Sequence, residues 1–450
     1  MADPPRIAII GAGPCGLGCA RELENLGHHN WTILESRDKP GGHAGSELDP
    51  QGFTWDEGGH VVFSHYGEFD RLLEEVMGED VYDHERSSYI RFDDRWVPYP
   101  FQNNLRYLPD EIEYECVLGL IEAPGGDPNM DFATWMESVF GRGITHHFMR
   151  PYNFKVWATP PERMASQWIG ERVSVIDFTR ALRNIVFEED DVAWGPNNKF
   201  VFPAEGGTGE IYRRLALKLG RDRIFYNRRM LELDSERKRI KLEDGSEEEY
   251  DYLVSTMPLD LLIRSMVHCP EDVRRAADEL EHNGVYIVGI GYEAPLKDDK
   301  SWMYFPKNEA PFYRATNFAK YSAANVPNGD TARYCAYMTE ISYSRYKPET
   351  VDGLEDRVEQ GLRAGGVIEG SPSVASAHVI DADYAYPVPT LTRDEALATI
   401  QPWLMQHDIY SRGRFGSWKY EIGNMDHAVK MGVDAARLIV EKTPEEVWTV

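Results

Sequence analysis

The sequence is poor in cysteine and in long apolar runs. Its five cysteines are scattered, with no C-x-x-C pair and no zinc-ligand spacing: Cys15, Cys19, Cys116, Cys269 and Cys335. This pattern argues against a disulfide framework and predicts free thiols in a reducing, cytoplasmic compartment. The longest strand-like apolar run, 285–292, is too short for a membrane span. The opening "MADPPRIAIIGAGP" has no signal-peptide pattern, so we expect neither a leader nor a membrane segment.

Positive charge is also scarce. Lys and Arg number 48 against 75 Asp and Glu, a formal net charge of −27. A surface this acidic predicts no binding to nucleic acid or to an anionic membrane. An anionic ligand would therefore need a local cluster of arginines. The length, 450 residues, predicts two or three packed units.

The N-terminal segment carries a nucleotide-binding pattern. Residues 6–10, "RIAII", are typical of a buried strand, and "GAGPCGLGCARELENLG" then places Gly11, Gly13 and Gly16 before a helical pattern. A second strand, "WTILE", ends at Glu35. The three glycines suit a tight turn, a close approach to a pyrophosphate and close helix–strand packing, and Glu35 suits ribose hydroxyls. The order of these elements predicts a bound dinucleotide.

Three further segments indicate which dinucleotide is bound. A second glycine turn, "KPGGHAGS" with Gly42, resembles the extended fingerprint of FAD proteins of the glutathione-reductase group. The segment 247–260 and the C-terminal "GRFGSWKYEIGNMDHAVKMGVDAARLIVE" resemble the parts by which such chains return to the FAD domain. The alternative is an NAD-binding Rossmann domain with unrelated glycines elsewhere.

The predicted fold class is α/β, with two insertions in an FAD-binding, Rossmann-like domain. We expect that domain to be discontinuous, made of residues 1–95, 196–270 and 391–450. Patterns such as "DFATWMESVFG" predict a helical substrate domain over 104–190. Strand-like runs such as "GVYIVGIGY" predict an antiparallel sheet domain over 271–390, joined by 86–103.

Arg, Tyr, Asn and Trp recur in short motifs within these insertions. They include "YPFQNN", "RPYNFKVWATP", "SWMYFPKNEAPFYRAT", "YAYPVPT" and "RGRFGSWKYEIGN". Arginine matches a diphosphate in charge and fork geometry. Tyrosine hydroxyls add uncharged donors, an aromatic next to an amide suits a flat base, and tryptophan can stack on a sugar.

These motifs resemble those of the eukaryotic, fungal-type UDP-galactopyranose mutases, in order from about residue 6 to about residue 438. The resemblance implies an FAD-dependent isomerase that interconverts UDP-galactopyranose and UDP-galactofuranose. It implies that N5 of the reduced flavin attacks the anomeric carbon with no net redox change, and that NADPH is the reductant. The expected partner is a UDP-hexose, and a homo-oligomer is compatible with the sequence.

The glycine pattern and the resemblance together imply the following site residues. Catalytic roles fall to His60, Arg172 and Arg314. FAD contacts fall to Gly11, Gly13, Pro14, Gly16, Glu35, Ser36, Gly42, Gly59, His60, Arg414, Gly423, Asn424 and Met425. UDP-sugar contacts fall to Tyr99, Phe101 and Gln102 at the uracil, with Asn153 and Trp157 nearby; to Tyr304, Arg314, Tyr386 and Tyr420 at the diphosphate; and to Arg172, Asn197, Trp302 and Asn424 around the sugar and flavin. NADPH contacts fall to Arg86, Ser88 and Arg414.

The stretch "DEGGHVVFSHY" places Gly58 and Gly59 directly before His60. The glycine pair lets the backbone approach the flavin ring, and the resemblance places His60 there, on a loop that shifts when the flavin is reduced. The alternative is a hydrogen-bonded turn histidine without a chemical role. No metal site is predicted from His60 and His65, since no carboxylate or cysteine is spaced to complete one.

Four positions depart from the family pattern: Glu205, Glu210, Lys419 and Met425. The alternatives that remain open are a mutase for another UDP-sugar, a flavin oxidase of the amine-oxidase type, and a catalytically inactive nucleotide-sugar-binding protein.

Overall fold

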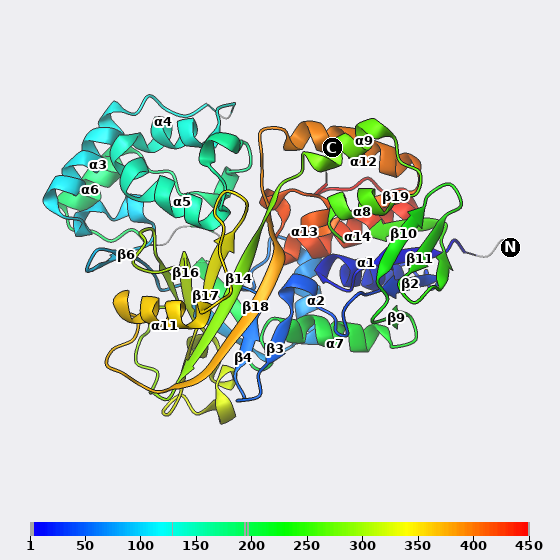
Figure 1. Cartoon of the computed structure of the whole chain (residues 1–450), viewed down its shortest axis with the longest axis horizontal. Helices are drawn as coiled ribbons and strands as arrows, with labels where there is room; N and C mark the ends of the chain where they lie inside the picture. The colour runs from blue at the N-terminus through cyan, green and yellow to red at the C-terminus, as the bar shows by residue number, and fades with distance from the viewer. Residues whose placement is uncertain (1–3, 128, 193–194, 196–197, 449–450) are drawn as a thin grey trace.

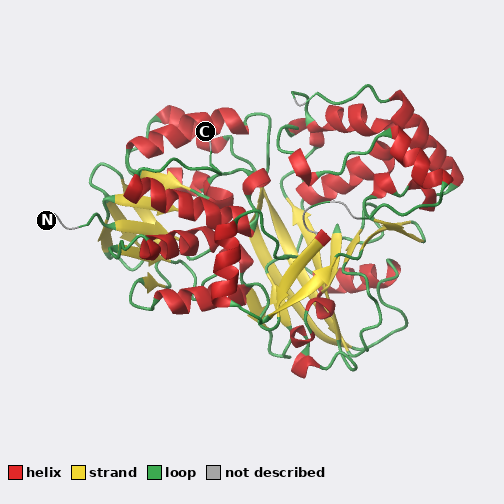
Figure 2. Ribbon diagram, turned by 180° about the vertical axis from the view of Figure 1, so that it is seen from behind, coloured by secondary structure: helices red, strands yellow, loops and turns green. Residues whose placement is uncertain are grey.

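Three groups of elements lie side by side in the molecule (Figures 1 and 2). The computed structural model describes residues 4–127, 129–192, 195 and 198–448. A parallel sheet with its helices lies at one end, and a helical insertion lies at the other. A long twisted sheet lies between them.

The parallel sheet takes its strands from three distant parts of the chain. Its order is β19 (Ile409–Ser411), β13 (Tyr252–Ser255), β1 (Ile7–Ile10), β2 (Trp31–Leu34) and β9 (Ile224–Phe225), all parallel. Strand β1 is buried along its whole length, which is typical of a parallel sheet covered on both faces.

Both faces of this sheet are covered, because side chains alternate along each strand. On β1, Ile7 and Ile9 join one core and Ala8 and Ile10 join the other. The first core holds α1 (Pro14–Asn25), α2 (Gly67–Val76), α7 (Gly209–Leu219) and α14 (Met425–Glu441). The second holds α8 (Leu259–Ser265), α9 (Glu271–Asp278), α12 (Arg393–Gln406) and the meander of β10 (Met230–Asp234), β11 (Arg239–Leu242) and β12 (Glu247–Glu249).

The central sheet has seven strands. Its order is β18 (Val374–Pro387), β14 (His282–Tyr292), β17 (Cys335–Tyr343), β16 (Arg314–Asn317), β15 (Trp302–Tyr304), β6 (Ser88–Phe92) and β7 (Arg95–Pro98). Its neighbouring strands are antiparallel except for β15 and β6, which are parallel. This one parallel pair differs from the antiparallel expectation because β6 and β7 come from a distant segment, so no hairpin fixes their direction. Helices α10 (Phe318–Tyr321) and α11 (Leu354–Ala364) flank this sheet.

The helical insertion consists of α3 (Asp110–Glu122), α4 (Phe132–Ile144), α5 (Arg150–Trp157) and α6 (Phe178–Val186). Helices α3 and α4 approach closely at two glycines: a Cβ on Gly141 would lie 2.0 Å from the carbonyl oxygen of Gly119. The apolar side chains of α4 share one core with β6 and the central sheet. That shared core fixes the helical insertion against the sheet.

The described chain also contains two short sheets and a short α-helix, besides several short 3-10 helices. The sheets and the α-helix are β3 (Ser46–Leu48) with β4 (Thr54–Asp56), β5 (Val81–Glu85) with β8 (Lys199–Pro203), and α13 (Gly413–Gly416). All five cysteines are free thiols. Within the described residues, no helix is long and apolar enough to cross a membrane.

Candidate active site

The glycine turn after β1 opens into a cavity of about 670 Å³, here called the glycine-lined cavity. Gly11 has φ +99°, a left-handed conformation that suits glycine. A Cβ on Gly16 would lie 2.0 Å from the Gly11 carbonyl oxygen, so only glycine lets α1 begin this close to the turn. Helix α1 begins with Pro14 at its first turn, and its free backbone N–H groups favour an anion there.

All but one of the predicted FAD residues line this cavity. They are Gly11, Gly13, Pro14, Glu35, Ser36, Gly42, Gly59, His60, Arg414, Gly423, Asn424 and Met425. Gly16 is the exception, because it packs behind the turn. The Glu35 carboxylate follows β2 and accepts hydrogen bonds from the backbone N–H groups of Ala12 (2.7 Å) and Arg37 (2.8 Å). It is thereby held beside the glycine turn.

The cavity fits an extended dinucleotide. Its lining includes the glycine turn, Glu35, the start of α14 and the Gly58–His60 loop. His60 Nδ1 is buried and has no hydrogen-bond partner among the described residues. Burial and the charge of Arg414 lower the pKa of His60 to about 4. A neutral imidazole with an unused nitrogen suits contact with a flavin ring.

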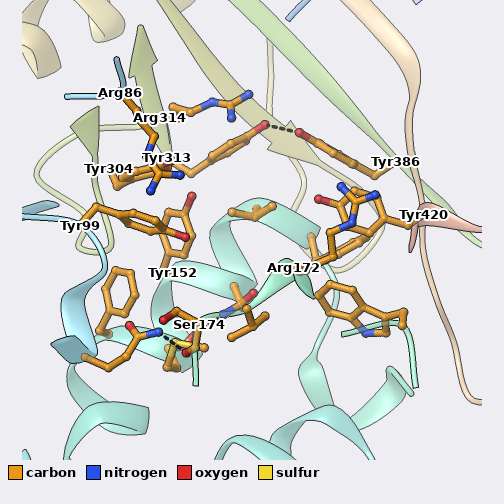
Figure 3. Close-up of a pocket in the computed structure, with 18 of the residues that line it drawn as sticks. Arg86, Tyr99, Tyr152, Arg172, Ser174, Tyr304, Tyr313, Arg314, Tyr386 and Tyr420 are labelled. Atoms are coloured by element: carbon orange, nitrogen blue, oxygen red, sulfur yellow. Dashed lines mark hydrogen bonds between the residues drawn. The ribbon is translucent and has the colours of Figure 1, made fainter. Parts of the chain in front are cut away.

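A second cavity of about 220 Å³ adjoins the first and is here called the tyrosine pocket (Figure 3). Its walls come from the helical insertion and from the central sheet. The two cavities share five lining residues: Phe63, Arg172, Arg314, Tyr386 and Tyr420. A ligand in the tyrosine pocket could therefore reach a ligand in the glycine-lined cavity.

Aromatic contacts set the shape of the tyrosine pocket. The Tyr99 and Tyr304 rings lie 5.1 Å apart, and Tyr152 meets Tyr304 edge-on at 5.6 Å. The hydroxyls of Tyr313 and Tyr386 are 3.2 Å apart (Figure 3). Burial raises the pKa of Tyr304 and Tyr386, so their hydroxyls stay protonated and can donate hydrogen bonds.

Most of the predicted substrate residues line this pocket. They are Tyr99, Gln102, Asn153, Trp157, Arg172, Tyr304, Arg314, Tyr386 and Tyr420. Trp302 and Asn424 line the glycine-lined cavity instead. Phe101 lines neither cavity. Its ring stacks on the ring of Phe148, with the ring centres 4.6 Å apart, and Phe148 lines the pocket in its place. Asn197 lies outside the described residues.

The three residues predicted for NADPH are dispersed. Arg86 lines the tyrosine pocket, and its guanidinium lies 5.1 Å from the Tyr99 ring centre. Arg414 lines the glycine-lined cavity and donates hydrogen bonds to the carbonyl oxygens of Ala385 and Gly423, each at 3.1 Å. Ser88 is buried in β6 and lines neither cavity.

Comparison with known proteins agrees with this geometry. Residues 14–440 match the family described as flavin containing amine oxidoreductase. A crystal structure of reduced UDP-galactopyranose mutase is 39% identical, covers 98% of this chain and 95% of its own, and superposes with a TM-score of 0.95. The chain belongs to the UDP-galactopyranose mutase family, within the flavin-containing amine oxidoreductases.

More distant relatives share the fold or a short segment. Cyclohexylamine oxidase from Brevibacterium oxydans has a TM-score of 0.67 at 16% identity, over 98% of this chain and 99% of its own. At that identity the likeness shows the fold alone. The 15-cis-phytoene desaturase of Synechococcus elongatus is 28% identical over 161 residues, 33% of this chain and 30% of that protein. Zeta-carotene desaturase from Solanum lycopersicum is 43% identical over 74 residues, 16% of this chain and 12% of that protein. The chain thus aligns with less than a third of either desaturase.

Membership of the UDP-galactopyranose mutase family confirms the predicted resemblance, the FAD-type Rossmann fold and a flavin cofactor. The narrower fungal-type assignment stays a prediction. Of the four departures from the family pattern, only Met425 lines either cavity. Glu205 is exposed, and Glu210 pairs with Arg213 and Arg214 on α7. Lys419 lies 4.6 Å from the ring centre of Trp448.

A second histidine ties the His60 loop to α14. Asp426, in the first turn of α14, accepts a hydrogen bond from the His65 backbone (3.1 Å) and pairs with His65 Nδ1 (2.6 Å) and His427 Nδ1 (3.1 Å). Burial opposes its ionisation, but these partners lower the pKa of Asp426 to about 2. Three potential ligand atoms of this group lie within 4.8 Å of one another. Since Asp426 on α14 holds both the backbone N–H and the side chain of His65, it fastens the loop that follows His60 to this helix.

Sequence reasoning missed several side chains at these cavities, among them two tyrosines and a glutamate. Tyr152 and Tyr313 line the tyrosine pocket, and each directly precedes a predicted residue, Asn153 or Arg314. Glu340 lines the glycine-lined cavity from the middle of β17. The tyrosines stood inside quoted motifs and could have been found there, whereas a single Glu within a strand pattern gives no local signal.

Proposed function

We propose that this protein interconverts UDP-galactopyranose and UDP-galactofuranose, with FAD in the glycine-lined cavity and the UDP-sugar in the tyrosine pocket. One observation carries the proposal: the two cavities meet at Arg172, Arg314, Tyr386 and Tyr420. The 39% identity to a UDP-galactopyranose mutase over 98% of the chain supports the choice of substrate. An isomerase needs both ligands side by side, which this arrangement offers.

The FAD site would be formed by the two helix N-termini and the His60 loop. The turn at Gly11 and the start of α1 would receive the pyrophosphate, and Glu35 would receive ribose hydroxyls. Asn424, at the start of α14, and His60 would lie at the flavin ring. When bound and reduced, FAD would supply the nucleophile that displaces UDP from the anomeric carbon, so that no net oxidation occurs.

The tyrosine pocket would hold and orient UDP. Tyr99 and Gln102 would receive the uracil, with Asn153 beside them. Arg314 and the Tyr386 hydroxyl would hold the diphosphate and stabilise the negative charge that develops as UDP leaves. Orientation is a large part of such catalysis, since the reacting atoms must lie roughly 3–3.5 Å apart.

We also propose a site for the reductant. Arg86 and Arg414 would receive the phosphates of NADPH, and this role fits Ser88 poorly because its side chain is buried in β6.

We propose that the chain divides into an FAD region, a helical region and a sheet region, as the sequence predicts. Helix α9 belongs to the FAD region in this division, because it packs against α12 and α8. The free cysteines suit the cytoplasm.

Chromatography of UDP-galactofuranose incubated with the protein tests this function. The FAD-loaded protein would be assayed oxidised, reduced with dithionite, and reduced with NADPH. We expect UDP-galactopyranose to form only in the reduced samples. A fully reduced, FAD-loaded protein that forms none would overturn the galactose assignment and direct the search to other UDP-sugars.

A further inference from the structure

One buried carboxylate contacts both the arginine of the tyrosine pocket and the loop that carries His60. Glu340 lies on β17 directly opposite Arg314 on β16. Arg314 donates from Nη2 to Oε1 of Glu340 at 2.8 Å and from Nε to Oε2. The same Oε1 accepts the backbone N–H of Gly59 at 3.1 Å. Glu340 is 3% exposed, so this three-donor arrangement is shielded from solvent.

We propose that Glu340 is a positioning residue that couples binding of a diphosphate in the tyrosine pocket to the position of the Gly58–His60 loop in the glycine-lined cavity. This inference rests on the proposed function, since it takes UDP as the ligand of the tyrosine pocket. Glu340 itself lines only the glycine-lined cavity, whereas Arg314 lines both. Its effect on the diphosphate would therefore pass through Arg314.

The hydrogen bonds leave one edge of Arg314 available. Nε and Nη2 are both engaged by Glu340, and within the described part of the chain no hydrogen bond engages Nη1. A guanidinium held along one edge by a carboxylate presents its remaining donors in a fixed direction. Because Arg314 lines the tyrosine pocket, that direction determines how it meets an anion.

The loop packs tightly against the same guanidinium. A Cβ on Gly59 would lie 3.0 Å from Arg314 Nη2 and 2.9 Å from Thr316 Oγ1. A Cβ on Gly58 would lie 3.3 Å from His60 Cε1 and 3.5 Å from Glu340 Oε1. The loop thus lies too close to the guanidinium to accept a side chain at Gly59, and we expect a shift of the guanidinium to move the loop.

The charge of Glu340 is what makes the link. Burial opposes its ionisation, but the charge of Arg314 and the hydrogen bonds from Arg314 and Gly59 lower its pKa. A diphosphate competes with Glu340 for the positive charge of Arg314 and so alters the hydrogen bond to Gly59. A glutamine has only one acceptor oxygen, and its amide would face donors. Glu340→Gln therefore leaves unpaired either Arg314 Nε, or both Arg314 Nη2 and the Gly59 N–H, and in either orientation it removes the charge that holds Arg314.

The coupling can be measured on the FAD-loaded protein with UDP as the probe. The Kd for UDP is determined for the oxidised and for the anaerobically reduced protein, and the ratio of the two is the coupling factor. Because coupling is reciprocal, UDP shifts the equilibrium between oxidised and reduced flavin by the same factor. We expect a ratio that differs from one by about fivefold or more in the wild type. In Glu340→Gln it falls to within about twofold of one.

The matched control is Glu22→Gln. Glu22 is also a buried glutamate paired with an arginine, Arg437, at 2.7 Å, but it lines neither cavity. This variant keeps the wild-type ratio. The coupling is overturned if the wild-type protein has a Kd ratio of one, or if Glu340→Gln has the same ratio as the wild type. Either result leaves the proposed function standing. A wild type that binds no UDP overturns both.

A second variant approaches the same link from the loop side. Gly59→Ala inserts a methyl group against Arg314 Nη2, although Gly59 does not line the tyrosine pocket. We expect the Kd for UDP of the oxidised, FAD-loaded variant to rise at least about fivefold. An unchanged Kd in an FAD-loaded Gly59→Ala protein contradicts the coupling, including in the case where Glu340→Gln fails to fold.

Discussion

The Arg172 guanidinium donates a hydrogen bond from Nη1 to Oδ1 of Asn424 at 2.8 Å, across 252 residues of sequence. Its Nη2 donates to the Glu421 carbonyl oxygen at 2.6 Å. Arg172 ends a short turn in the helical insertion, and Asn424 is the N-cap of α14. The insertion and the parallel-sheet region thus touch where the two cavities meet.

Replacing Arg172 should remove these hydrogen bonds between the two regions. We predict that Arg172→Ala lowers kcat/KM for UDP-galactofuranose at least about 100-fold, because the bonds that fix Asn424 and the pocket wall are lost and misplacement alone can cost that much. FAD content should not change. The control is Arg180→Ala, an arginine of α6 whose side chain is 52% exposed and pairs with Asp191. Equal activity in the two variants would remove Arg172 from the site.

Arg314 should matter for the charge on the leaving diphosphate. We predict that Arg314→Ala lowers kcat about 10²–10³-fold, the usual loss when one donor to a developing anion is removed, while FAD stays bound. Arg314→Lys should recover part of the loss, since lysine keeps the charge without the planar fork. Steady-state kinetics and the flavin absorption of the purified variants measure both effects. Near-normal turnover in Arg314→Ala would contradict this role.

The Tyr313 and Tyr386 hydroxyls, 3.2 Å apart, should act as a unit. A double-mutant cycle with Tyr313→Phe, Tyr386→Phe and the double variant would measure their coupling in UDP affinity. We expect a coupling of about 0.5–1.5 kcal/mol, the net value of one hydrogen bond, because either change alone leaves a buried hydroxyl unpaired. Strictly additive effects would show that the two hydroxyls hold UDP independently.

His60 should contribute to the pH dependence of stability. Burial and the charge of Arg414 lower its pKa from 6.5 to about 4, so between these values the unfolded chain binds more protons than the folded one. Its contribution to stability is therefore complete above pH 6.5 and is lost as the pH falls toward 4. We predict that Tm falls less steeply over this range in His60→Gln than in the wild type. Parallel Tm profiles would show that His60 is not held neutral.

The sequence predicted what depends on local backbone geometry. The turn at Gly11, the helix after it and Glu35 at the end of β2 follow from glycine conformation and strand patterns, which are fixed within about 30 residues. The long strands of the central sheet follow from their β-branched and aromatic content.

Features that depend on distant pairing could not be predicted in this way. The parallel contact between β6 and β15 joins segments far apart in the chain. Glu340 reaches Gly59 across 281 residues, so nothing near either residue indicates the contact. Phe101 belongs to a motif of the pocket but packs behind Phe148, because a motif does not say which way each side chain points.

Counting turnovers per reduction tests the central claim most directly. The FAD-loaded protein is reduced once with a stoichiometric amount of dithionite under anaerobic conditions, and UDP-galactofuranose is added in 100-fold excess while flavin absorption is followed. An isomerase with no net redox change converts many substrate molecules per flavin, and the flavin stays reduced. Formation of at most one product molecule per flavin, with reoxidation of the flavin, would contradict the account.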